Sequence, residues 1–111
     1  MIINFWAKWC SNCRREMPIL NEVYKEYKSR GLEIISINID GKKYRDDVTR
    51  IAQHFSFPIC MTADVIEASF SQPRFVPTNY LIGKNGEFLG EIFADEDLTK
   101  EGLVKILQER L

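Results

Sequence analysis

The chain has 111 residues, enough for one compact domain and too few for two hydrophobic cores, so we expect a single domain over residues 1–111. Hydrophobic residues make up 45% and charged residues 28%, a balance that argues against both a disordered chain and a membrane span. Basic and acidic side chains nearly cancel to a formal charge of -1, which excludes a broad basic surface for nucleic acid or anionic lipid.

The first half of the chain predicts a strand-helix-strand unit. Residues 1–6 form a short apolar run that is typical of a strand buried on both faces. From Ser11 to about Arg30, apolar side chains recur every three or four positions, which predicts an amphipathic helix that Gly31 ends. Residues 32–39 predict a second strand, parallel to the first because a helix connects the two.

A second helix is predicted further along, because the apolar side chains between residues 48 and 55 fall on one helical face. A short strand at residues 57–61 and a short helix at residues 64–70 follow. These two elements complete the middle part of the chain.

The last part of the chain predicts a hairpin and a closing helix. Strands at 78–82 and 87–93 are joined through Asn85-Gly86, a step that favours a hairpin turn, so the two strands should be antiparallel. Residues 98–111 predict the closing helix. The whole order predicts an α/β fold of three layers, α/β/α, with a mixed central sheet and a functional site at the carboxyl end of a strand.

A secreted fold stabilised by disulfides would need more cysteines than three, and an even number of them. We therefore interpret the three cysteines as one functional pair and one spare thiol. Cys10 and Cys13 lie where the first predicted strand meets the first helix, so the N–H groups of the first turn and the helix dipole converge on the Cys10 sulfur. Such a setting lowers a thiol pKa from about 8.5 by one to several units, which makes Cys10 a nucleophile near neutral pH. Cys13 is close enough to attack a mixed disulfide formed at Cys10.

Basic side chains surround this pair, although the first turn of a helix normally favours acidic ones. Lys8, Arg14 and Arg15 have two readings. They form a positive cluster that further stabilises the Cys10 thiolate, or they are ordinary solvated side chains beside a surface turn.

A zinc site is the main alternative reading of the cysteines, because zinc takes four nitrogen or sulfur ligands. Cys10, Cys13, His54 and Cys60 could nominally supply them, but His54 and Cys60 do not form a second close-spaced ligand pair. A purely structural disulfide is less favoured still, because so short a loop gains little entropy. We interpret His54 as a surface residue and Cys60 as a small buried hydrophobe.

Several motifs together resemble the thioredoxin superfamily. They are Phe-Trp-Ala-Lys-Trp-Cys-Ser-Asn-Cys at residues 5–13, Pro18, Val-Pro-Thr-Asn-Tyr-Leu-Ile at 76–82, and Asn-Gly at 85–86. More narrowly, the chain resembles the TlpA/ResA-like thiol-disulfide oxidoreductases, including the thiol reductases of cytochrome c maturation, because residues 46–70 add an extra helix-strand stretch. The resemblance implies a thioredoxin-like fold and covers nearly the whole chain, without the family's usual N-terminal strands.

The resemblance also implies roles for individual residues. Cys10 would be the exposed attacking thiol, Cys13 the buried resolving thiol, and Trp9 the aromatic wall beside them. Pro77 would be a cis-proline facing the disulfide, and the cis bond would leave the backbone of Val76 free to pair with an extended substrate segment. Trp9, Val76 and Pro77 are therefore the expected substrate-binding residues.

Two departures from the family pattern affect the expected proton transfer. Asn4 stands where thioredoxin proper has a buried acid, and Gly41 occupies the place where the TlpA/ResA-like branch often has one. Asp40, Glu16 or water therefore remain as candidate proton acceptors for Cys13. Ser11-Asn12 replaces the commoner Gly-Pro or Glu-Pro between the cysteines, so the direction of electron flow stays open.

The sequence thus predicts an enzyme that reduces or exchanges disulfides in protein substrates through Cys10 and Cys13. An upstream thiol donor would supply its electrons. We expect a monomer, no cofactor, no metal, no nucleic-acid partner and no membrane span in this chain. The resemblance suggests a periplasmic or other extracytoplasmic location, and allows for a membrane anchor in the full-length protein.

A peroxide-reducing relative on the same fold is a further alternative. That activity would need a peroxidatic cysteine in a pocket rich in Thr and Ser and supported by Arg. The sequence contains no such cluster.

Overall fold

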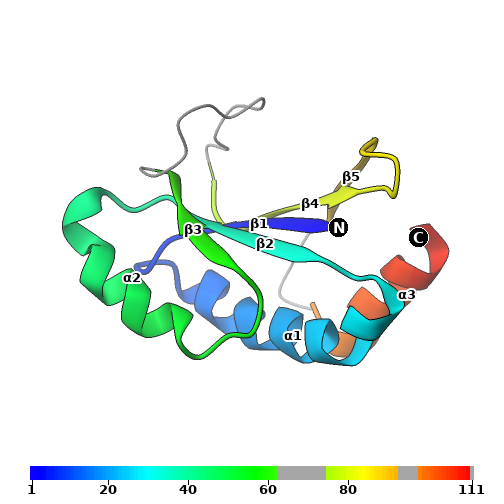
Figure 1. Ribbon diagram of the computed structural model, residues 1–111, viewed down its shortest axis with the longest axis horizontal. Coiled ribbons are helices and arrows are strands. Elements are labelled where there is room, and N and C mark those ends of the chain that lie inside the picture. The colour runs from blue at the N-terminus through cyan, green and yellow to red at the C-terminus, as the bar shows by residue number, and fades with distance from the viewer. Residues whose placement is uncertain (63–74, 93–97, 111) are drawn as a thin grey trace.

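The computed structural model describes residues 1–62, 75–92 and 98–110. Their strands form one five-stranded sheet in the order β3-β2-β1-β4-β5 (Figure 1). The strands are β1 Ile2–Trp6, β2 Ile34–Asn38, β3 Ile59–Met61, β4 Thr78–Ile82 and β5 Phe88–Ile92. Strands β1, β2 and β3 run parallel, whereas β4 is antiparallel to both β1 and β5, which confirms the predicted mixed sheet.

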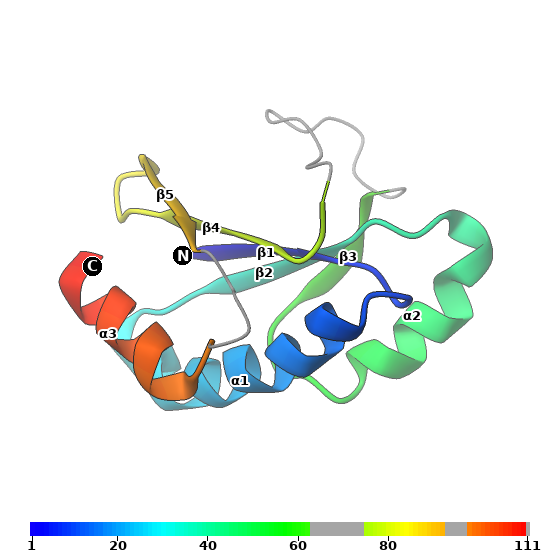
Figure 2. The same ribbon diagram turned by 180° about the vertical axis from the view of Figure 1, so that it is seen from behind.

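The helices of the described residues lie on one face of this sheet, as both ribbon views show (Figures 1 and 2). They are α1 Ser11–Tyr27, α2 Arg45–Ala52 and α3 Lys100–Arg110, with short 3-10 turns at Lys28–Arg30 and Lys42–Tyr44. The predicted helix at 64–70 lies outside the described residues. None of the described helices is both long and apolar enough to cross a membrane.

Side chains along the central strand β1 point alternately to the two faces of the sheet, and those on one face pack against the helices. Ile2 and Trp6 of β1 belong to a large core with Met17 of α1 and Leu103 of α3. Ile3 and Phe5 of β1 face the other way and form a smaller cluster with Ile37 of β2. Because β1 is central and buried along its whole length, its carboxyl end is a fixed platform for the turn that follows.

Several elements are shorter than the sequence predicts, and the second helix shows why. Apolar spacing predicts a second helix as far as residue 55, but α2 ends at Ala52, and Phe55 instead stacks on Phe57 with ring centroids 5.5 Å apart. The first α-helix ends at Tyr27, three residues before the predicted end, and the 3-10 turn at Lys28–Arg30 continues it to Gly31. Gly31 adopts a left-handed φ of 98° that a side chain would disfavour, so it ends this helical stretch as predicted.

Candidate active site

The chain enters α1 from β1 through a tight turn that places Cys10 at the N-cap. The Cys10 N–H donates to the Ala7 carbonyl over 3.1 Å, and the Cys10 Sγ in turn accepts the N–H of Cys13 over 3.1 Å. The first turn of α1 contains no acidic residue. The N–H of Cys13 at this helix start therefore points at sulfur rather than at a carboxylate cap.

Cys10 and Cys13 are joined in a disulfide, with their Cα atoms 5.3 Å apart. Cys13 is 0% exposed and Cys10 is 6% exposed, so Cys10 is the more accessible of the two. The expectation of an exposed attacking thiol is wrong for this oxidised form, because the surrounding turn covers most of Cys10. Cys60, on β3, takes no part in this disulfide and is partly buried.

The segment that leads into β4 reaches this disulfide, because β4 is antiparallel to β1 and begins at the edge of the sheet where β1 ends. The Val76–Pro77 peptide bond is cis, as the resemblance implies, and the Val76 carbonyl oxygen lies 3.6 Å from the Cys10 Sγ. Trp9 precedes the cysteine pair and is 71% exposed, which leaves its ring available to contact another molecule. Cys10, Trp9, Val76 and Pro77 are thus brought to one edge of the sheet.

Asp40 anchors the turn that carries Cys10. Its Oδ2 accepts the backbone N–H of Lys8 and the side-chain Nδ2 of Asn38, each over 2.8 Å, and the carboxylate is buried. The candidate proton acceptor Asp40 is therefore engaged in holding the strand-to-helix turn.

We expect Asp40→Ala to lower the free energy of unfolding by about 2 kcal/mol, because it leaves two buried donors without an acceptor. Asp40→Asn keeps one oxygen acceptor and should lose clearly less. Urea unfolding of the oxidised proteins measures both changes. Equal losses for the two variants would contradict this anchoring role.

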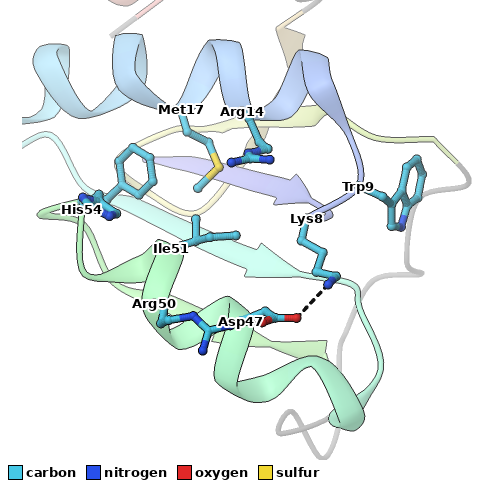
Figure 3. A pocket seen from close by; sticks show the side chains of 9 residues that line it. Lys8, Trp9, Arg14, Met17, Asp47, Arg50, Ile51 and His54 are labelled. Atoms are coloured by element: carbon cyan, nitrogen blue, oxygen red, sulfur yellow. Dashed lines mark hydrogen bonds and ion pairs between the residues drawn. The ribbon is translucent and has the colours of Figure 1, made fainter.

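Of the three basic residues near the cysteines, Lys8 pairs with a residue of α2. Lys8 points toward α2, where its Nζ lies 2.7 Å from the Asp47 carboxylate and 4.4 Å from the centre of the Tyr44 ring (Figure 3). Arg14 and Arg15 are exposed. The Lys8 side chain is thus paired with Asp47 on α2.

Glu16 lies one helical turn after Cys13 and is 0% exposed. Its Oε1 accepts a long hydrogen bond of 3.4 Å from Asn79 Nδ2, while its Oε2 has no hydrogen-bond partner. Burial raises the pKa of Glu16 from 4.5 to about 7, against smaller opposing effects of Arg15 and Asn79. Glu16 therefore exchanges a proton near neutral pH.

Asn79 links Glu16 to the centre of the sheet. Its Oδ1 accepts from Asn4 Nδ2 over 2.7 Å, and Asn4 Oδ1 accepts from Ser36 Oγ over 2.7 Å. A chain of buried polar side chains thus runs from α1 through β4 and β1 to β2. Asn4 cannot itself hold a proton at this position, but it orients the amide that contacts Glu16.

The ligand set of the zinc alternative is not assembled. Within residues 1–62, 75–92 and 98–110, no group of three or more His, Cys, Asp or Glu side chains is placed to hold a metal ion. His54 instead lines a cleft between α1 and α2, and Cys60 lies on β3 opposite Ile37 of β2.

Sequence reasoning missed Asn79, the role of Asp40, and the contribution of α2 to the surroundings of the cysteines. A signal for Asn79 was present, because a polar residue in the middle of a predicted buried strand needs a hydrogen-bond partner. The pairing of Lys8 with Asp47 had no comparable signal, because 39 positions separate the two residues.

The mixed sheet, the Cys-x-x-Cys pair at a helix N-terminus and the cis-proline facing it define a thioredoxin-fold domain. A thiol:disulfide interchange protein of the thioredoxin family from Chlorobium tepidum TLS has the same fold, with a TM-score of 0.74 at 24% identity over 98% of this chain and 77% of that one. The model of the AhpC/TSA family matches residues 1–88, so the chain belongs to the AhpC/TSA family.

Curated relatives agree with this placement. The thiol-disulfide oxidoreductase ResA of Geobacillus kaustophilus is 38% identical over 112 residues, which cover 97% of this chain and 61% of that protein. ResA of Bacillus thuringiensis subsp. konkukian is 33% identical over 111 residues, covering 98% of this chain and 62% of that protein. The chain thus spans about three fifths of the length of these relatives.

Proposed function

We propose that this chain is a thiol-disulfide oxidoreductase that reduces or exchanges disulfides in protein substrates. The observation that supports this most strongly is the Cys10–Cys13 disulfide at the N-terminus of α1, with the Val76 carbonyl 3.6 Å from the outer sulfur. The name of its 38% identical relative, a thiol-disulfide oxidoreductase, supports the same reaction.

In the reductive direction, the Cys10 thiolate attacks one sulfur of a substrate disulfide and expels the other as a thiolate. The Cys13 N–H, which already donates to the Cys10 sulfur, stabilises the anion before the attack. Cys13 then attacks the Cys10 sulfur of the mixed disulfide. This step releases the second substrate thiol and leaves the protein in the Cys10–Cys13 disulfide form.

Cys13 must lose its proton before it attacks, and Glu16 is the acceptor that we propose. Glu16 is one helical turn from Cys13, a separation of about 5–6 Å between Cβ atoms in an α-helix. Its pKa of about 7 makes both the accepting and the donating form available at neutral pH. The proton returns from Glu16 when an upstream thiol donor reduces the disulfide again.

Substrate binding is assigned to Trp9, Val76 and Pro77. The Val76 backbone beside Cys10 offers polar groups with which an extended segment can pair as a short added strand, and the exposed Trp9 ring offers apolar surface. The substrate class that fits is a protein segment with an accessible disulfide.

Reduced Cys13→Ser, combined with Cys60→Ser, is expected to trap one substrate chain per protein as a mixed disulfide at Cys10. The attack at Cys10 still occurs, but the resolving thiol is gone. Insulin is a suitable disulfide substrate, and intact-mass analysis under non-reducing conditions identifies the adduct. The matched variant is Cys10→Ser combined with Cys60→Ser, which keeps Cys13 as its one thiol. An adduct that forms as readily in this variant would contradict the proposed order of attack.

A further inference from the structure

A cleft of about 650 Å³ opens between α1 and α2 (Figure 3). It lies directly beside the turn between β1 and α1 that carries Cys10, which we call the redox turn. Trp9 stands at the side of the cleft nearest the cysteines, and Arg14, the residue after Cys13, points into it from α1. The residues of α2 that line it include Asp47, Arg50 and Ile51. The cleft therefore shares its border with the Cys10–Cys13 motif.

The charged groups of the cleft do not balance. Lys8, Arg14 and Arg50 contribute three positive charges, and Asp47 contributes one negative charge. Asp47 is engaged by both Lys8 and Arg50. Arg14 has no ion-pair partner among the residues that the structure describes, so its charge is available to a ligand.

The inner surface of the cleft is apolar. Met17 is fully buried in the core and lines the cleft from α1, and the partly buried Ile51 and Phe55 line it from the other side. A ligand that fills the cleft must therefore present an apolar group to the partly buried Ile51 and Phe55 and a negative charge to the arginines.

We infer that this cleft is a specificity subsite for an acidic and apolar segment of the protein substrate, next to the cysteine that Cys10 attacks. The inference rests on the proposed function, because it names the substrate sequence that the redox site prefers. Trp9 and Cys10 are adjacent, and consecutive Cα atoms of an extended chain are about 3.8 Å apart. A segment whose cysteine lies at Cys10 thus reaches the cleft within a few residues.

Two synthetic peptides provide the test. Each has a single cysteine joined by a disulfide to 2-mercaptoethanol. One carries Glu and Leu on both sides of the cysteine, and the other carries Gln and Leu. Reduced protein converts each peptide to its free thiol and releases 2-mercaptoethanol, while Cys10 and Cys13 become the disulfide. We expect the Glu peptide to react about three- to tenfold faster at low salt, a preference that 1 M NaCl should abolish by screening.

Variants show whether the cleft causes this preference. Arg50→Gln removes one positive charge on α2 without touching the redox turn. Arg14→Gln removes the positive charge that has no ion-pair partner among the described residues. Each should reduce the ratio of the Glu to the Gln rate at least about twofold, in line with the loss of one exposed charge contact. Lys105→Gln, an exposed change on α3, is the matched control and should keep the wild-type ratio.

A second measurement does not depend on thiol chemistry. The same peptides with serine in place of cysteine are titrated into the oxidised protein by calorimetry, where the Glu peptide should bind more tightly than the Gln peptide. Equal binding and equal rates for the two peptides would overturn the subsite, and so would an unchanged preference in both arginine variants. If the proposed function is wrong, neither disulfide peptide is reduced, whereas the binding difference remains.

Discussion

Replacing Cys10 by serine is expected to lower the rate of disulfide reduction at least about a thousandfold, because a serine hydroxyl is not ionised near neutral pH and cannot form a mixed disulfide. The Cys13 thiol remains in this variant, but it is 0% exposed and lies beneath Cys10. The chemistry of the site therefore depends on the outer sulfur. Insulin reduction with dithiothreitol as electron donor measures the effect.

Cys60→Ser is the matched control, because it removes the third cysteine without touching the redox turn. It should retain the wild-type rate of insulin reduction. Circular dichroism of the Cys10→Ser protein checks that its fold is kept. A folded Cys10→Ser protein with wild-type turnover would show that Cys10 is not the nucleophile.

The second large effect concerns Glu16 and the pH dependence of stability. The folded-state pKa of about 7 is above the unfolded value of 4.5, so the folded protein binds the proton more tightly. Glu16 therefore supports folding fully below about pH 4.5. This support is lost as the pH rises through about 7, and the difference is on the order of 3 kcal/mol.

Glu16→Gln should remove this part of the pH dependence, because the amide stays neutral throughout the range. The measurement is urea unfolding of the oxidised proteins between pH 4.5 and pH 8, and the quantity compared is the slope of the unfolding free energy with pH. Glu22→Gln, an exposed change on the same helix, should keep the wild-type slope. Identical slopes for Glu16→Gln and the wild type would show that the carboxyl group does not titrate in this range.

Local patterns were sufficient to predict most elements that position the site. The apolar run at residues 1–6 became β1, and the three- and four-residue spacing after Ser11 became α1. The hairpin could also be predicted, since Gly86 takes the positive φ of 83° that the Asn-Gly step favours. These features depend on neighbouring residues, whose effects can be read from a single sequence. The cis bond before Pro77 depended on the family resemblance instead.

Contacts between distant segments could not be predicted in the same way. Asp40 reaches back to Lys8, and Asn79 meets Glu16, only because the sheet order brings these segments together. Lys8 was read as a neighbour of the cysteines, but the 3-10 turn and α2 supply Tyr44 and Asp47 on its other side. The direction of a long side chain depends on such tertiary partners.

The buried polar chain across the sheet connects Ser36 of β2 with the carboxyl group of Glu16 on α1. Ser36 lies on β2, a strand that contributes neither a cysteine of the disulfide nor a residue of the proposed substrate site. A hydroxyl on β2 orients Asn4, which orients Asn79, which contacts the carboxyl group of Glu16. A substitution at Ser36 can therefore change the hydrogen bonding around Glu16 while the cysteine turn is left unchanged.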